Sequence, residues 1–117
     1  MSLALGVTLP AVAFASAALS PPTVAPVLAG TVLPPGTDVF LEWTASNKTS
    51  SAGFGYKVYL DINSGGYSLI ATLGNELSYS SSYSMALGET YSFKVVPFND
   101  AGDGPESNVY STILPFI

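Results

Sequence analysis

Short runs of alternating apolar and polar residues, separated by turn residues, make up the chain from residue 25 onward. The runs richest in β-branched and aromatic side chains cover residues 39–43, 56–60, 67–71 and 91–96. Such runs are typical of half-buried β-strands. Glycine, proline and asparagine cluster between them, as at residues 63–66 and 99–105, which is the chemistry of turns. No later stretch has a long helical period, so the pattern predicts an all-β sandwich or small barrel.

The alternation also predicts which side chains form the core. Successive side chains of a strand point to opposite faces, so Tyr91 pointing inward takes Phe93 and Val95 with it. The same alternation turns Lys57 and Tyr59 outward from their own strand. The expected core residues, which include the single tryptophan, are Trp43, Tyr56, Val58, Tyr91, Phe93 and Val95.

Four motifs along the chain carry a family resemblance. In order they are Leu41-Glu42-Trp43, Tyr56-Lys57-Val58-Tyr59, residues 85–95 (MALGETYSFKV) and residues 99–107 (NDAGDGPES). Together they closely resemble a fibronectin type III domain that covers about residues 24–114. The resemblance implies a seven-stranded, immunoglobulin-like antiparallel β-sandwich, with Trp43 in its core and Tyr91 forming the tyrosine corner of the sixth strand.

The first 37 residues carry no ionised side chain, whereas the three lysines and eight acidic residues all follow from Asp38 onward. We therefore divide the chain into an apolar N-terminal arm with a Pro-rich connector, residues 1–23, and a fibronectin type III-like domain, residues 24–117. Uncharged apolar residues left in water promote aggregation, so we expect the arm to lie on a partner or on its own domain. The expected contact residues of the arm are Leu3, Leu5, Val7, Leu9, Val12, Phe14 and Leu19.

Two other interpretations of residues 1–19 stay open. A secretory signal peptide fits the apolar run, although the positive residues that normally precede such a run are absent. A transmembrane helix fits less well, because the run is at the short limit of about 17–25 residues and Pro10 interrupts it. A membrane is therefore not an expected partner.

Charge and composition exclude several function classes. The net charge is −5, and only Lys48, Lys57 and Lys94 are positive, which argues against binding nucleic acid. The chain has no histidine and no cysteine, which removes imidazole catalysis, thiol nucleophiles and the usual zinc and haem ligands. The acidic residues within 99–106 lack the alternating spacing of a calcium loop. We expect no enzymatic activity, small-molecule substrate, cofactor or metal.

A second candidate contact surface lies on the outward side of the strands. It comprises Tyr59, Val96 and Phe98, flanked by Lys57 and Lys94. Exposed aromatic and β-branched residues on one sheet face can form an apolar patch that binds a protein partner. Ordinary cross-strand pairs are the alternative interpretation of the same residues.

These features predict a non-catalytic structural or protein-interaction subunit of a multi-subunit assembly, whose partners are other protein subunits. The resemblance extends to modules carried on virus particles, so the specific expectation is a single-module bacteriophage decoration or tail accessory protein, located in the virion and anchored by its arm. The alternative is an exported, extracellular module: an adhesin, a filament subunit or an accessory domain of a polysaccharide-degrading enzyme. In that case residues 1–19 are a signal or a strand that joins subunits. The glycosylation sequon Asn47-Lys48-Thr49 has meaning only in a secretory route.

Overall fold

The computed structural model describes residues 20–33, 37–47, 52–83 and 88–114, which form eight β-strands and no helix. The strands are β1 (Leu28–Leu33), β2 (Asp38–Trp43), β3 (Gly55–Ile62), β4 (Ser68–Leu73), β5 (Ser78–Ser82), β6 (Glu89–Asn99), β7 (Gly102–Asp103) and β8 (Tyr110–Leu114). Since no described residue is helical, none forms a helix with the length and apolar character of a membrane span.

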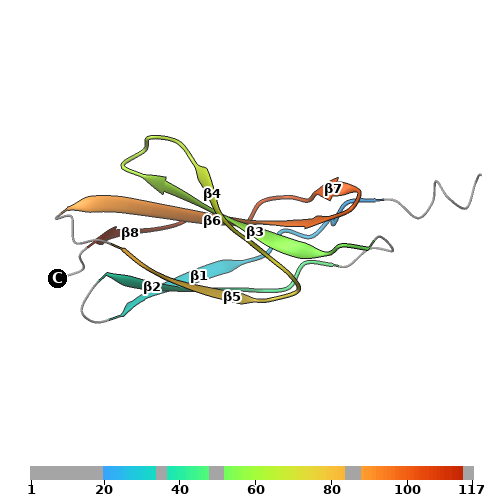
Figure 1. Ribbon diagram of the computed structural model, residues 1–117, viewed down its shortest axis with the longest axis horizontal. Helices are drawn as coiled ribbons and strands as arrows, with labels where there is room; N and C mark the ends of the chain where they lie inside the picture. The colour runs from blue at the N-terminus through green and yellow to red at the C-terminus, as the bar shows by residue number, and fades with distance from the viewer. Residues whose placement is uncertain (1–19, 34–36, 48–51, 84–87, 115–117) are drawn as a thin grey trace, which may run out of the picture.

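The strands form two antiparallel sheets that pack face to face (Figure 1). One sheet has the order β1-β2-β5, and the other has the order β4-β3-β6-β7, with β8 also paired to β6. β7 and β8 pair with opposite ends of β6, on the side away from β3, so they are two pieces of one interrupted edge strand. Counted this way the sandwich has seven strands, and the expected all-β architecture is confirmed.

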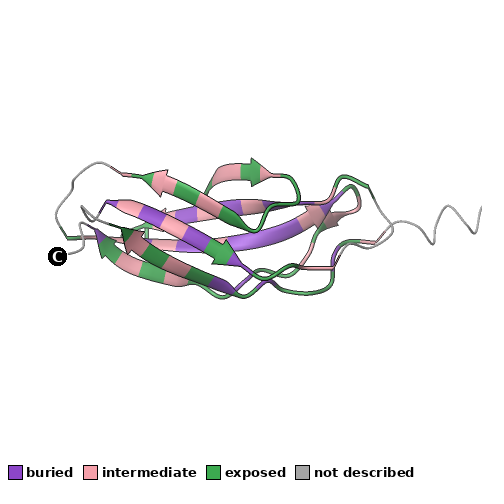
Figure 2. Ribbon diagram, turned by 90° about the horizontal axis from the view of Figure 1, so that it is seen from below, coloured by how far each residue is buried: buried purple, intermediate pink, exposed green. Residues whose placement is uncertain are grey.

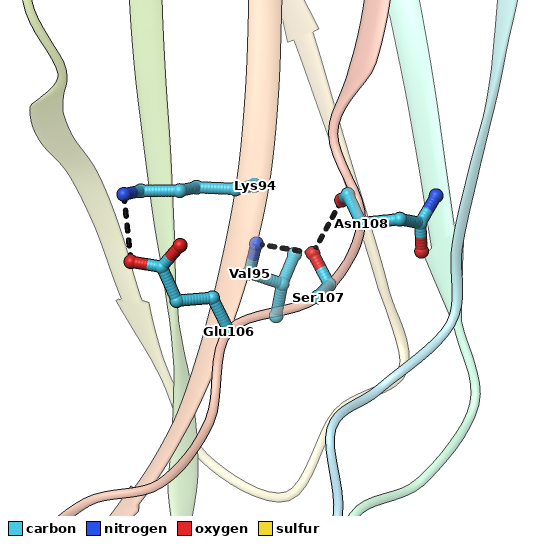
Figure 3. A network of polar contacts seen from close by, with 5 residues as sticks. All are labelled: Lys94, Val95, Glu106, Ser107 and Asn108. Atoms are coloured by element: carbon cyan, nitrogen blue, oxygen red, sulfur yellow. Dashed lines mark hydrogen bonds and ion pairs between the residues drawn. The ribbon is translucent and has the colours of Figure 1, made fainter.

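The interruption between β7 and β8 is bridged by a serine. Ser107 accepts a hydrogen bond on its Oγ from the Val95 N–H (2.9 Å) and donates its own N–H to the Val95 carbonyl (2.8 Å). Figure 3 shows Ser107 seated against β6 at this point, with its hydroxyl also bonded to the Asn108 carbonyl (2.7 Å). The hydroxyl oxygen and the backbone N–H of Ser107 thus continue the ladder beside Val95, between β7 and β8.

The core lies between the two sheets, and burial alternates along most strands (Figure 2). Its aromatic residues pack as tilted pairs: the ring centroids of Trp43 and Tyr56 lie 5.6 Å apart, and those of Tyr83 and Tyr91 lie 4.9 Å apart. Such pairs stabilise a core beyond the area they bury. All six residues expected in the core lie in one buried cluster: Trp43, Tyr56, Val58, Tyr91, Phe93 and Val95.

Tyr91 is buried at the start of β6, where the tyrosine corner is expected. Its hydroxyl donates a hydrogen bond to the Glu89 carboxylate, with 3.1 Å between Oη and Oε1. Burial raises the pKa of Tyr91, and the bond to Glu89 raises it further. The upstream backbone that a tyrosine corner would bond falls partly in residues 84–87, outside the described part of the chain.

Candidate interaction surfaces

The described chain begins at Ser20, which is fixed to the turn between β6 and β7. The Ser20 carbonyl accepts a hydrogen bond from Asn99 Nδ2 (2.8 Å), and Asn99 is itself buried. Pro22 is buried against Gly104, where a β-carbon would lie only 2.6 Å from the Pro22 carbonyl oxygen. The absence of a side chain at Gly104 therefore allows the connector to dock on this end of the sandwich.

Asn47 holds the next part of the connector. Its Oδ1 accepts hydrogen bonds from the N–H groups of Thr23 (2.8 Å) and Val24 (3.0 Å), and its Nδ2 donates to Thr23 Oγ1 (2.9 Å). The nitrogen that a glycan would modify is thus already used inside the protein. The sequence analysis did not predict this role of Asn47, because its partners lie more than 20 residues away in the sequence and no local pattern indicates them.

The arm residues expected to contact a partner all lie outside the described residues. They are Leu3, Leu5, Val7, Leu9, Val12, Phe14 and Leu19. Only their point of attachment is placed: Ser20, at the pole of the sandwich where β6 ends.

The outward face of β3 and β6 is not the exposed apolar patch that the sequence suggested. Val96 is only 6% exposed, and Tyr59 and Phe98 are half-buried. Lys57 on β3 forms an ion pair with Asp103 on β7 (2.8 Å), so its side chain crosses β6 beside Val96. The alternation correctly predicted that Val96 points away from the core. Its predicted exposure was wrong, because the charged side chain of Lys57 from the neighbouring strand covers it.

The two lysines of this face are engaged with rings as well as with carboxylates. Lys94 forms a second ion pair, with Glu106 (2.8 Å), visible in Figure 3. Its Nζ lies 4.3 Å from the ring centroid of Tyr67 and 5.6 Å from that of Tyr59. Such contacts are favourable because the face of an aromatic ring carries negative charge. A shallow hollow of about 290 Å³ remains between these residues.

Two acidic residues near the β6–β7 turn, Asp103 and Glu106, serve as ion-pair partners. The hydrogen bond from Lys57 to Asp103 raises the pKa of Lys57 above its ordinary value of 10.5, against the opposing effect of desolvation. Glu106 binds Lys94, and Asn99 binds the connector. Among the described residues no group of three or more His, Cys, Asp or Glu side chains could hold a metal ion.

One lateral side of the sandwich, where β1 approaches β8, is closed by side chains. Asn108 pairs with β1 as a strand would: its Oδ1 accepts from the Leu28 N–H (2.7 Å) and its Nδ2 donates to the Leu28 carbonyl (2.9 Å). Figure 3 shows this amide pointing away from β6, toward the segment that leads into β1. Tyr110 lies directly against Gly30, where any side chain would overlap its ring, and stacks on Phe93. We call this the closed side.

The opposite lateral side, formed by the edges of β4 and β5, is open. Each of these strands pairs with only one neighbour in the described sandwich. Beside β4, on the core-facing side of the β3–β4 hairpin, lies an open hollow of about 380 Å³. Its lining is mainly apolar and consists of Leu60, Ile62, Gly65, Gly66, Ser68 and Ile70. We call this the open side.

Comparisons with known proteins find similarity in structure. No protein-family model and no curated protein matches the chain. The fibronectin type III domain of human fibronectin type III domain containing protein 3 is 26% identical, with a TM-score of 0.60, over 80% of this chain and 86% of that one. The FN1–FN3 domains of chicken CNTN1 are 27% identical, with a TM-score of 0.64, over 81% of this chain and 35% of that one.

A more distant similarity extends to larger proteins. The twitchin kinase region from C. elegans is 17% identical, with a TM-score of 0.67, over 82% of this chain. This chain spans 17% of the twitchin fragment and 35% of the CNTN1 fragment, but 86% of the isolated human domain. The similarity therefore concerns one domain of those proteins.

Proposed function

From the premise that this chain has the fibronectin type III fold, we propose that it is a non-catalytic structural subunit that joins a protein assembly through its N-terminal arm. Domains of this fold are usually non-catalytic interaction modules. A fold by itself does not define a function, so the proposal depends on what distinguishes this chain.

The observation that carries the proposal is the junction between the arm and the sandwich. Residues 1–19 are uncharged and rich in apolar side chains, and the connector that follows is held by Asn99, Gly104 and Asn47. The arm is thereby attached at one defined end of the sandwich. Fixing the connector before binding also lowers the conformational entropy lost on assembly.

The charges of the sandwich favour a protein partner. Both lysines among the described residues are already paired with carboxylates. Phosphate groups of nucleic acid would have to compete with those carboxylates for the lysines. Protein interfaces instead combine an apolar centre with a polar rim, which suits an apolar arm beside an acidic domain.

The test compares the full-length chain with a chain that begins at Ser20. We expect light scattering to give a defined oligomer, or a complex with a partner, for the full-length chain. We expect a monomer with an unchanged circular dichroism spectrum for the truncated chain. Starting at Ser20 keeps its carbonyl for Asn99, so a loss of assembly would not reflect a damaged sandwich. Equal oligomeric states for the two chains would overturn the proposal.

A virus particle is the setting that we propose for this assembly, by analogy with fibronectin-type modules that decorate virions. The alternative setting is extracellular, as an adhesin, a filament subunit or an accessory module of a polysaccharide-degrading enzyme. Mass spectrometry of purified particles and of the secreted fraction separates the two. The intact chain in particles supports the virion, and a secreted chain beginning near residue 18 supports the extracellular module.

A further inference from the structure

β4 is an edge strand with little protection against the pairing of a further strand. Among the described strands it pairs with β3 alone, and its sequence, SLIATL, contains no charged residue and no proline. Natural edge strands usually carry a lysine, a proline or an inward-pointing charge that prevents another strand from adding. The bulge beside Ile70, where the register with β3 shifts, is the one protective feature of this edge.

The free edge of β4 also borders exposed apolar surface. The side chain of Leu69 is 51% exposed on its outer face. On the inner face Ile70 and Leu60 line the hollow of about 380 Å³ and contribute to the core. A strand added beside β4 would cover this hollow with the side chains of its own inner face.

The arm contains a segment with the pattern that such a strand needs. At residues 3–9 the large apolar residues Leu3, Leu5, Val7 and Leu9 alternate with Ala4, Gly6 and Thr8. A period of two with one apolar and one small face is the signature of a half-buried strand. The segment contains no charge, and Pro10 directly after it limits its length.

We propose that residues 3–9 of one copy of this chain add to the free edge of β4 in a second copy as an antiparallel strand. The large residues of the arm would face the hollow, and the small ones would continue the outer face. This is strand addition, in which backbone hydrogen bonds supply affinity and alternate side chains supply specificity. The inference rests on the proposed function, because it names the surface that the arm binds.

The course of the chain favours a second copy over the arm's own domain. β4 and β6 are both antiparallel to β3, so both end at the pole where Ser20 is bound to Asn99. An arm running directly toward its own Ser20 would lie parallel to its own β4. Parallel pairing is slightly less stable, and the rest of this sheet is antiparallel. The arm of another copy can approach in the antiparallel direction.

Cysteine cross-linking tests the proposal cleanly, because the chain has no cysteine of its own. One copy carries Thr72→Cys, on the exposed outer face of β4, and a differently tagged copy carries a single cysteine at each of positions 3 to 9 in turn. After mixing and oxidation we expect cross-linked pairs mainly at positions 4, 6 and 8, because neighbouring side chains on adjacent strands share a face. Thr31→Cys, exposed on the other sheet, is the control and should cross-link at least 10-fold less.

A second variant tests the edge without cysteines. Leu69→Lys places a charge on the exposed face of β4, and we expect it to weaken self-association at least 10-fold while leaving the folded sandwich intact. Leu33→Lys is the matched control, because Leu33 is also exposed (43%, against 51% for Leu69) but lies on β1. Equal association of the two variants would overturn the assignment to β4.

The outcomes separate this inference from the proposed function. If the full-length chain assembles through its arm but cross-links between the arm cysteines and Thr72→Cys are absent, the β4 site is wrong and the proposed function stands. If a chain that begins at Ser20 assembles as well as the full-length chain, both are wrong.

Discussion

The two lateral sides of this sandwich differ in how their outer strand edges are covered. On the closed side, the Asn108 amide binds both backbone groups of Leu28, and Tyr110 covers Gly30. On the open side, β4 and β5 leave their outer edges unpaired, and a hollow borders β4. A seven-stranded sandwich has two such sides, and here only one of them is completed by the described residues.

The difference shows that a single side chain can pair with a strand edge at one residue. An amide has one donor and one acceptor, which match the N–H and the carbonyl of one residue on a neighbouring strand. At Leu28, Asn108 therefore does for β1 what a further strand would do, and β4 has no such partner among the described residues. The open side is for this reason the place where another chain can add.

The largest expected change in the free energy of unfolding comes from truncating one core leucine on each side. We expect Leu28→Ala to lower the free energy of unfolding by about 4 kcal/mol and Leu60→Ala by about 2 kcal/mol. Both side chains are buried, at 4% and 7% exposure, but Leu60 borders a hollow that already admits solvent, so its removal creates less new cavity. Urea denaturation measures both values. Equal losses would mean that the two sides are equally well packed.

The next effect isolates the Asn108 bridge. We expect Asn108→Ala to cost about 1–3 kcal/mol, because it leaves two backbone groups of the buried Leu28 without their partner. Asn47→Ala is the matched control: it also removes an asparagine that bonds backbone groups, but its partners are exposed and can bond water instead. Thermal unfolding should show a smaller loss for the control. The bridge has no special role if the two variants lose the same stability.

The smallest effect concerns the outer face, which belongs to neither side. We expect Lys57→Gln to cost about 0.2–1 kcal/mol at neutral pH, because the ion pair with Asp103 is partly exposed. The losses of unfolding free energy caused by Leu28→Ala and Leu60→Ala should be the same when Lys57→Gln is also present. The reason is that this variant touches neither Leu28 nor Leu60. Double-variant unfolding curves check that additivity.

Lys57 on this face and Tyr91 in the core make stability depend on alkaline pH. Folding raises the pKa of Lys57 above its ordinary 10.5 and that of Tyr91 above its ordinary 10.0, so the folded state keeps protons that the unfolded state loses first. Their contribution is complete below about pH 10 and is lost as pH rises through the folded-state pKa values. We expect Lys57→Gln and Tyr91→Phe each to make the fall in stability above pH 10 shallower. A slope unchanged in both variants would contradict these shifts.

Much of the fold could be predicted from local pattern. Residues such as Tyr91, Phe93 and Val95 lie in the core as expected, because side chains of a strand alternate and one parity must be buried. The same rule failed for the exposure of Val96, which points outward but lies beneath the ion pair of Lys57. The alternation along a strand predicts the direction of a side chain, whereas the neighbouring strands determine what covers that side chain.

The amino-acid sequence by itself determined the all-β class, the strands that became β2, β3, β4 and β6, the core-facing residues of β3 and β6 and the uncharged character of the arm, because each depends on residues close together in the chain. Only the tertiary structure decided which side of the sandwich is closed and where the connector docks. Asn108 meets Leu28 across 80 residues, and Asn99 meets Ser20 across 79. Contacts over such separations leave no periodic signal, since both asparagines bind backbone groups, which every residue carries.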